Sequence, residues 1–447
     1  MRVTNNQIYG QSSRAMSHAN DRVMDIQKKI TENTSIVSPS DNPVGAREVM
    51  QYESSNQSLK QYDNNMKMAK GHLEYEEVAL QSYNGLLDEA RTMLIQADNT
   101  ANTHQDIGAI ADQVSSMVDS MEDLMNSRSA DGSYIFSGTN TQAPAFTHLP
   151  DGTFKWSGNE GQNFAQISES RKVAVSDSGK HIFEDVWKRN TFSTKLSVGN
   201  SDVVSKVSNQ DDFDAFLKRH FSVTNQASNH FVLTTTPLSM TKPDAAAIQS
   251  LVSQRAQDAA ANKTADAKND NKYDEKSYIG PPGRYFFADS SGNIIASGTY
   301  DPNKNLIIQG MSFSLKGDPG AIVDVDLNKP ERDNVVNVLR NTIKVMKDPN
   351  ASSEERDIAL KNGQVSIVNT QTSVGRVRSM VGARLNSMTE RGDFSTANQM
   401  ANTMAQERVA GLDMGKAATE LSMSETALNA SQKLFTRIDN LSLFNKI

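Results

Sequence analysis

The sequence predicts an α+β protein in which a pair of terminal helices encloses a helical bundle, and the bundle encloses a mostly β insertion. Apolar residues recur at helical spacing at both ends of the chain and in two long inner stretches. Short alternating runs separated by turn residues fill the middle. Because the patterns repeat in reverse order on the two sides of the middle, the two ends are expected to come together.

The two ends carry matching apolar stripes with a spacing of seven residues. The first helix is expected from Asn6 to Asn33, and its mate from Ala418 to Ile447. Such a stripe needs a partner helix, so we expect the two to pair as a coiled coil. The predicted assembly interface consists of Tyr9, Met16, Val23, Ile26 and Ile30 near the N-terminus and Leu421, Leu428, Leu434, Phe435, Ile438 and Leu441 near the C-terminus.

The energetics of this pair point to contacts between subunits. Burying one apolar side chain contributes roughly 1.5 to 3 kcal/mol, whereas ordering each residue costs roughly 1 to 2 kcal/mol, so the pair alone is marginal. We therefore expect the terminal helices to be disordered before assembly and to order between neighbouring subunits. A closed monomeric bundle is the alternative.

Residues 34–42 are expected to form a linker, marked by Pro39, Asp41 and Pro43. Proline does not continue a helix interior, but it suits the first turn of a helix, and Asn42 is a good N-cap. A second helix is therefore expected to begin at Pro43.

That second helix has the clearest periodicity of the chain, and only Glu76 interrupts its apolar series. A third helix is expected after Thr103, which forms a capping box with Asp106. The apolar series of the second helix consists of Leu59, Tyr62, Met66, Ala69, Leu73, Leu80, Tyr83, Leu87, Ala90, Leu94 and Ala97.

The middle of the chain changes to strand and turn patterns. Residues 133–198 and 285–327 contain short apolar runs bounded by glycine, proline and asparagine, which is typical of strands. Between them, helices are expected at Asp212–Phe221 and Pro243–Ala267, and the polar stretch Ala261–Lys276 is expected to be a mobile connection.

Helical spacing resumes after Pro330. A long helix is expected to start at a capping box formed by Ser352 and Glu355, and Gly392–Phe394 is expected to bend it. The predicted domains are residues 1–42 with 395–447 for polymerisation, residues 43–132 with 330–394 as a helical bundle, and residues 133–329 as the outer β-rich insertion.

Composition excludes several classes of function. The formal net charge is -7 without a basic block, which argues against nucleic acid as a partner. No apolar run approaches the roughly eighteen residues of a membrane span, and the mean hydropathy is -0.56. The first residues have no apolar core typical of a cleaved signal peptide, so any secretion is expected to use another route. Cysteine is absent, which excludes disulfides and thiol chemistry.

No motif supports catalysis, a cofactor or a metal. The chain has no glycine-rich phosphate loop, zinc helix or nucleophile elbow, and its seven histidines are scattered. Asp324 and Asp326 alternate with valines and could suggest calcium, but a solvated strand face is the preferred interpretation. We expect a protein that is not an enzyme.

Five stretches of the chain are distinctive, namely Met1-Arg-Val-Thr, Ser38-Pro-Ser-Asp-Asn-Pro-Val-Gly-Ala, Gly132-Ser-Tyr-Ile-Phe-Ser-Gly, Ala427-Leu-Asn-Ala-Ser and Leu441-Ser-Leu-Phe-Asn-Lys-Ile. In these stretches the chain resembles the hook-associated protein 3 family of the flagellin superfamily. The resemblance covers roughly residues 1–200 and 330–447. The chain departs from the family pattern at Asn42, where a second aspartate is common, and at Pro144-Ala-Phe, where a Pro-Phe pair is common.

The resemblance implies a structural protein of the bacterial flagellum, located outside the cell at the hook-filament junction. It implies type III export in an unfolded state without a cleaved signal peptide, and a flagellar export chaperone on the C-terminal helix. The implied partners are other copies in a ring, hook-associated protein 1, flagellin and the export apparatus. The alternatives are a flagellin that forms the filament itself, a flagellar scaffold that carries an adhesin or enzyme insertion, and a coiled-coil scaffold unrelated to flagella.

Overall fold

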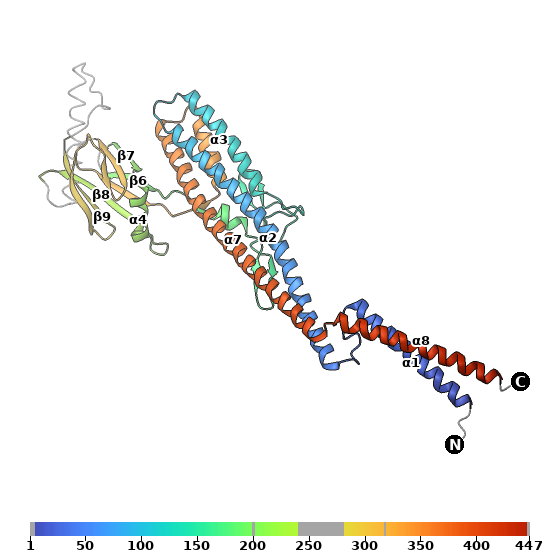
Figure 1. Cartoon of the computed structure of the whole chain (residues 1–447). Coiled ribbons are helices and arrows are strands. Elements are labelled where there is room, and N and C mark those ends of the chain that lie inside the picture. The colour runs from blue at the N-terminus through green and yellow to red at the C-terminus, as the bar shows by residue number, and fades with distance from the viewer. Residues whose placement is uncertain (1–4, 199–201, 240–280, 317–318, 445–447) are drawn as a thin grey trace, which may run out of the picture.

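The computed structural model describes residues 5–198, 202–239, 281–316 and 319–444. The molecule is elongated, with both chain ends at one tip, long helices in the middle and antiparallel sheets toward the other end (Figure 1). Helices from opposite ends of the sequence lie side by side, α1 with α8 and α2 with α7. The predicted α+β class with nested helices is therefore confirmed. Within the described part, no helix combines the length and apolar character that a bilayer span needs.

The outer helix pair consists of α1 (Asn5–Glu32) and α8 (Met414–Phe444), which run antiparallel (Figure 1). The first helix ends because Asn33 takes a left-handed φ of 52°, and the amide of Thr34 then donates to the carbonyl of Lys29 at 3.1 Å. At the same point the amide of Ser35 donates to the carbonyl of Ala410 at 2.7 Å. The two chain segments thus leave the bundle together.

The bundle is built on two long antiparallel helices, α2 (Pro43–Ala97) and α7 (Ser353–Ala410). Two shorter helices, α3 (His104–Met125) and α6 (Val335–Lys347), join them at the end nearer the sheets. The predicted N-caps are present: the Asn42 side chain accepts from the amide of Gly45 at 3.0 Å, and capping boxes open α3 and α7. From Met66 onward the apolar series of α2 faces this core. The fully buried members of the core include Leu73, Leu80, Tyr83, Leu87, Leu94, Val114, Met121, Leu339, Ile367, Val374 and Val381.

The bend predicted at Gly392–Phe394 is wrong, because α7 runs without interruption to Ala410. Its second half keeps packing on α2, where the amide of Gln399 donates to Asp63 at 2.6 Å and that of Asn402 donates to Asn56 at 2.9 Å. A glycine inside a helix costs only about 1 kcal/mol relative to alanine, which these contacts offset. The helical break between bundle and terminal pair therefore lies at Gly411, not between residues 394 and 395.

Several short β elements lie on the bundle, and their apolar side chains share its core. Phe136, Phe146, Phe154 and Phe183 are buried in the same cluster as Tyr83. The elements are β1 (Phe146–His148), β2 (Phe154–Trp156), β3 (Phe164–Gln166), β4 (Lys172–Ala174), the π-helix η1 (Lys180–Glu184), β5 (Val186–Trp187) and β14 (Arg332–Asp333).

The outer part has a separate core between two antiparallel sheets. One sheet has the order β10-β9-β8-β13-β6, and the other has the order β11-β12-β7. Its elements are β6 (Phe192–Val198), β7 (Asp202–Val207), α4 (Gln210–His220), η2 (Gln226–Asn229), β8 (His230–Pro237), β9 (Gly283–Asp289), β10 (Ile294–Tyr300), β11 (Leu306–Ile308), β12 (Met311–Lys316) and β13 (Ile322–Leu327).

The helix predicted at Asp212–Phe221 is confirmed as α4, whose N-cap Asn209 accepts from the amides of Asp211 and Asp212. The helix predicted at Pro243–Ala267 and the connection Ala261–Lys276 lie outside the described residues. The two cores divide the single β insertion that the sequence suggested, since residues 133–187 pack with the helices and only residues 192–327 contribute to the outer sheets.

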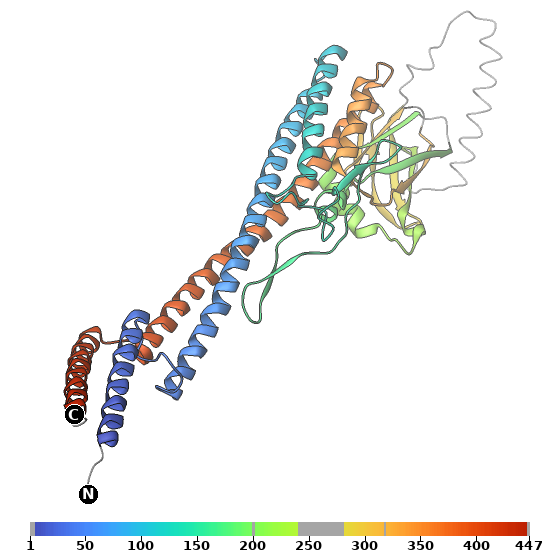
Figure 2. The same cartoon turned by 90° about the vertical axis from the view of Figure 1, so that its right-hand side faces the viewer.

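Two short connections join the outer sheets to the bundle, residues 188–191 and 328–331, and the outer part stands beside one end of the bundle (Figures 1 and 2). A cleft of about 620 Å³ separates β7 and β12 from the start of α7 and is lined largely by polar residues. Across it Lys206 Nζ lies 3.9 Å from Asp357 Oδ2.

Candidate assembly site

The candidate assembly site is the α1–α8 pair, whose contact begins near the tip of the molecule. The rings of Tyr9 and Phe435 lie 5.0 Å apart, centroid to centroid, in a tilted arrangement. This contact places the beginning of α1 against the later part of α8, as an antiparallel pair requires. Two residues from opposite ends of the predicted interface therefore meet in one subunit.

The predicted seam is only half covered within one subunit. Val23 is 7% exposed, but Tyr9 is 44% exposed and Leu434 is 58% exposed. Six further members of the predicted set are half-buried: Met16, Ile26, Ile30, Leu421, Leu428 and Phe435. Ile438 and Leu441 belong to α8, but their side chains lie outside the described part. The pair thus retains uncovered apolar surface along its length.

A shallow hollow of about 380 Å³ lies beside the pair where α8 begins. It is lined by Ile26, Leu412 and Met423 together with charged side chains of both helices. One of these, Lys29, forms an ion pair with Asp25 at 2.8 Å, and this hydrogen bond raises the pKa of Lys29. The lining of the hollow therefore combines apolar and charged side chains, as at many protein contact surfaces.

The linker between α1 and α2 is organised by Asp41. Its carboxylate accepts hydrogen bonds from the amides of Val37 and Ser38 at 3.1 and 3.0 Å, and these bonds lower the pKa of Asp41. Pro43 occupies the first turn of α2 as predicted, and Pro39 lies in the turn before it. The aspartate thus fixes a turn where sequence reasoning assigned only a linker.

Polar side chains join α2 and α7 along one edge of their seam. Arg378 donates to Glu77 at 2.6 Å, and Gln371 donates to Asp88 at 2.6 Å. In the sequence, Gln371 and Arg378 lie between the buried residues Ile367, Val374 and Val381 of the same helix. They pair with acidic residues of α2, which sets the register of the two helices.

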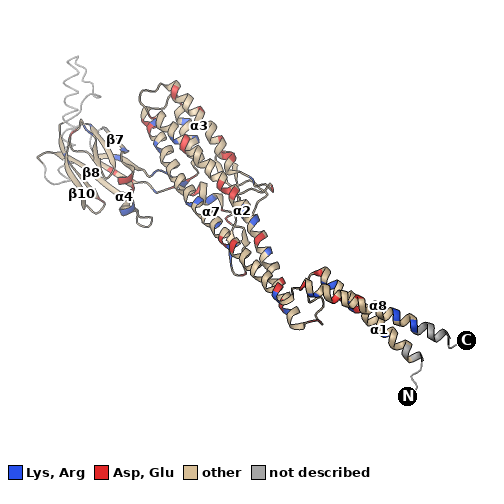
Figure 3. Ribbon diagram, viewed as in Figure 1, with Lys and Arg blue, Asp and Glu red and all other residues tan. Residues whose placement is uncertain are grey.

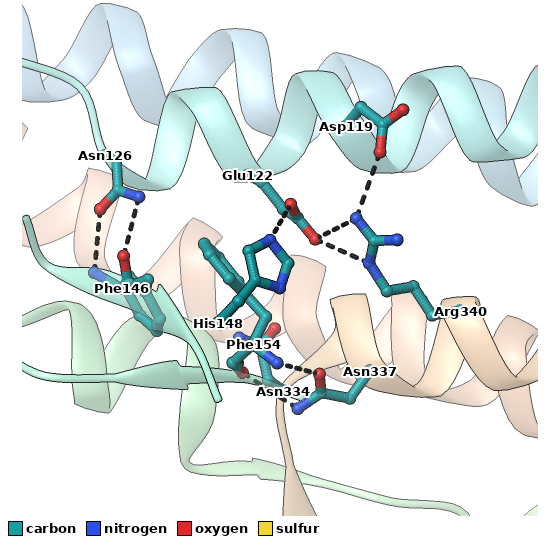
Figure 4. Close-up of polar contacts among 9 residues, drawn as sticks. All are labelled: Asp119, Glu122, Asn126, Phe146, His148, Phe154, Asn334, Asn337 and Arg340. Atoms are coloured by element: carbon teal, nitrogen blue, oxygen red, sulfur yellow. Dashed lines mark hydrogen bonds and ion pairs between the residues drawn. The ribbon is translucent and has the colours of Figure 1, made fainter. Parts of the chain in front are cut away.

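The β1–β2 hairpin is tied to the helices by polar side chains (Figure 4). The Asn126 side chain accepts from the amide of Phe146 and donates to its carbonyl, at 2.9 and 3.0 Å. Asn337 does the same for Phe154, at 2.8 and 3.1 Å. Side chains at the end of α3 and on α6 thus hold the main chain of the hairpin.

A charged group beside the hairpin adds a further link. Arg340 of α6 lies 2.7 Å from Glu122 of α3, and Glu122 also lies 3.0 Å from His148 of β1 (Figure 4). Glu122 is largely buried, and its carboxylate contacts Arg340 of α6 and His148 of β1. Sequence reasoning missed this cluster, because its members are far apart in the chain.

The outer sheets contain the aspartates considered for calcium. His230 lies between them, 2.8 Å from Asp326 and 3.7 Å from Asp324, and Ser197 donates to Asp324. Across the described ranges, no group of three or more His, Cys, Asp or Glu residues is arranged to hold a metal ion.

Acidic and basic residues are interspersed along the helices (Figure 3).

The fold and the helix pair define an elongated protein with paired terminal helices, a long-helix bundle and an outer β part. Residues 3–141 match the family described as the bacterial flagellin N-terminal helical region. The chain is therefore similar to proteins of the flagellin family, and in particular to those of the hook-associated protein 3 type that its motifs resemble.

Among its relatives are the flagellar hook-associated proteins 3 of Salmonella typhimurium and Escherichia coli, each 22% identical over 186 residues. The match covers 42% of this chain and 58% of each relative, so it spans less than two thirds of their length.

Solved structures share the fold over most of the chain. The flagellar hook-associated protein 3 of Legionella pneumophila has a TM-score of 0.54 at 16% identity, covering 81% of this chain and 98% of that one. FlgL of Xanthomonas campestris has a TM-score of 0.52 at 13% identity, covering 80% of this chain and 99% of that one. The two comparisons therefore show a common fold at low sequence identity.

Proposed function

We propose that this protein is a structural, non-enzymatic component of the bacterial flagellum that forms the junction ring between hook-associated protein 1 and the flagellin filament. The proposal rests first on the relatives, which are named as flagellar hook-associated protein 3. The observation in this chain that carries it is the α1–α8 pair, which stands at the tip of an elongated molecule with its apolar seam half uncovered.

The assembly interface is proposed to consist of this pair in neighbouring copies. Isolated in water, two helices with half-exposed apolar residues gain too little from burial to offset the ordering cost of about 1 to 2 kcal/mol per residue. Neighbouring subunits would cover Tyr9, Leu434 and the half-buried residues. Assembly through the chain ends then leaves the sheets on the outside.

The proposed route to the assembly site is type III export, with a flagellar chaperone that holds the C-terminal helix beforehand. The exposed residues Met423 and Leu434 of α8 support this part, since they offer apolar contacts on a helix that packs against α1. If removing residues 418–447 left chaperone affinity unchanged, this part of the proposal would fail.

The interface is tested by placing a charge in the seam. Val23→Asp and Leu428→Asp should abolish incorporation and swimming while the bundle stays folded, because a carboxylate there has no partner when neighbours close over it. The matched control is Ile307→Asp, which places the same charge at an exposed isoleucine of β11. Swimming assays and circular dichroism of the purified variants provide the two readouts.

The outcomes separate assembly from stability. Loss of swimming in both seam variants with normal helix content supports the proposal. Normal swimming by the seam variants would contradict a role for the α1–α8 pair. An equal loss of swimming in Ile307→Asp would show that the effect is not specific to the α1–α8 pair, and it would also count against the proposal.

A further inference from the structure

Glu76 is an acidic residue inside the hydrophobic core of the bundle. It lies on the buried face of α2 between Leu73 and Leu80, where it interrupts the apolar series, and its exposed fraction is 0%. Neither of its carboxyl oxygens accepts a hydrogen bond from an N–H or hydroxyl donor among the described residues, and the side chain of Asp177 lies close enough to share a proton with it. An ionised carboxylate in such a place lacks both water and a donor, which is strongly unfavourable.

The neighbouring charges do not compensate Glu76. Asp177, in the segment between β4 and η1, is also buried, and Arg384 of α7 binds both of its oxygens at 2.6 and 3.0 Å. The side chain of Gln162 donates to the same carboxylate at 2.9 Å. The buried cluster therefore contains two carboxyl groups and one guanidinium, and Asp177 already occupies that guanidinium.

The other titratable groups around this position have partners of their own. On α2, Glu77 binds Arg378 of α7, and His72 lies 3.9 Å from Asp131. On η1, Lys180 binds Glu160. Tyr83, seven residues further along α2, is fully buried and carries no charge at neutral pH. In the part of the chain that the structure describes, these pairings leave no second cation at Glu76.

We propose that Glu76 is a proton-binding site, whose carboxyl group is protonated in the folded protein. Folding of α2 against α7 and the segment 176–184 then takes up one proton from solution. The neutral acid fits the apolar face of α2 and leaves a single negative charge, that of Asp177, opposite Arg384.

The electrostatics agree with this geometry. Burial, and after it the negative charge of Asp177, raise the pKa of Glu76 well above its ordinary range, while Arg384 acts in the opposite direction. In the unfolded chain the pKa of a glutamate is about 4.3. Between that value and the raised pKa of the folded state, the folded protein binds one proton more than the unfolded chain.

The sign of the pH effect follows from this difference. Because the folded state holds the extra proton, this site destabilises the fold as pH rises through the window, by up to about tenfold in the unfolding equilibrium constant per pH unit. Above the window Glu76 ionises beside Asp177. The repulsion then loosens the segment 176–184 from α2 before the rest of the bundle opens.

The experiment compares the full chain with Glu76→Gln, which keeps the shape of the side chain but takes up no proton. The control is Glu74→Gln, which removes an exposed carboxylate two residues earlier in α2. Denaturant unfolding over a series of pH values from 5 to 9 gives the pH slope, and hydrogen exchange by mass spectrometry reports on residues 176–184.

The expected result is a flatter slope for Glu76→Gln, by up to one proton, with protection factors at 176–184 that do not change with pH once the intrinsic pH dependence of amide exchange is divided out. The control keeps the slope of the unmodified protein. Equal slopes in all three proteins would overturn the proposal. If Glu76→Gln fails to fold, infrared spectroscopy of the unmodified protein decides, since a protonated-carboxyl band at pH 7 supports the proposal and its absence overturns it.

Discussion

Arg384 shows how one side chain connects the long helices to the β elements on the bundle. Its guanidinium makes a bidentate contact with Asp177, which lies three residues before the start of η1. Both side chains are largely buried. Removing one partner of a buried ion pair leaves the other without compensation.

We predict that Arg384→Leu lowers the free energy of unfolding of the bundle by about 3 to 5 kcal/mol. Thermal or denaturant unfolding followed by circular dichroism measures the change. Arg391→Leu serves as the control, since Arg391 lies over the ring of Phe394 at the surface and such contacts contribute about 1 kcal/mol or less. Similar losses in both variants would show that the buried pair has no special role.

The helix α7 differs from the expectation that its sequence raises. Gly392 predicts a bend, yet the helix continues through it. A Cβ placed at Gly392 would meet no atom within 4 Å, whereas one placed at Gly363 would lie 2.8 Å from Leu94 Cδ1. The two glycines of one helix therefore have opposite roles, one dispensable and one required for close packing.

We expect Gly392→Ala to raise the stability of the protein by about 0.5 to 1 kcal/mol, because alanine loses less conformational entropy in a helix. Gly363→Ala should lower it, since Leu94 has to move to make room. Melting temperatures of the two variants measure the pair of effects. A lower melting temperature for Gly392→Ala would mean that the helix uses this glycine for a contact or a bend.

Helices with a long apolar series and a capping residue were predictable from the sequence. The starts at Pro43, His104 and Ser353 follow local rules, since Asn42, Thr103 and Ser352 cap their own helices. These interactions span three or four residues, so the sequence contains all of their partners.

What could not be predicted depends on contacts between distant segments. The β elements of residues 133–187 look like strands of an outer domain, but Phe136, Phe146 and Phe183 pack against the helices. Glu76 was visible as an interruption, and only its position beside Asp177 and Arg384 gives that interruption a role. The Tyr9–Phe435 contact joins the chain ends, which the matching stripes suggested but could not place in register.

At the scale of the whole molecule, the nested order of elements places the chain ends and the sheets far apart (Figure 2). The α1–α8 pair occupies one tip, the bundle the middle, and the outer sheets attach through the short connections 188–191 and 328–331. A subunit with this arrangement can assemble through its tip and still present the sheets to solvent. In the proposed junction, the α1–α8 pairs of neighbouring copies pack together and the outer sheets stay exposed.

The most direct test of the proposed junction role is the amount of unpolymerised flagellin that a deletion strain releases into the medium. A junction protein is needed before the filament can grow, so its absence should leave flagellin exported but unassembled. We predict abundant monomeric flagellin and no filaments in the deletion strain, reversed by the unmodified protein and not by Leu428→Asp. Normal filaments on the deletion strain, with little flagellin in the medium, would contradict the account.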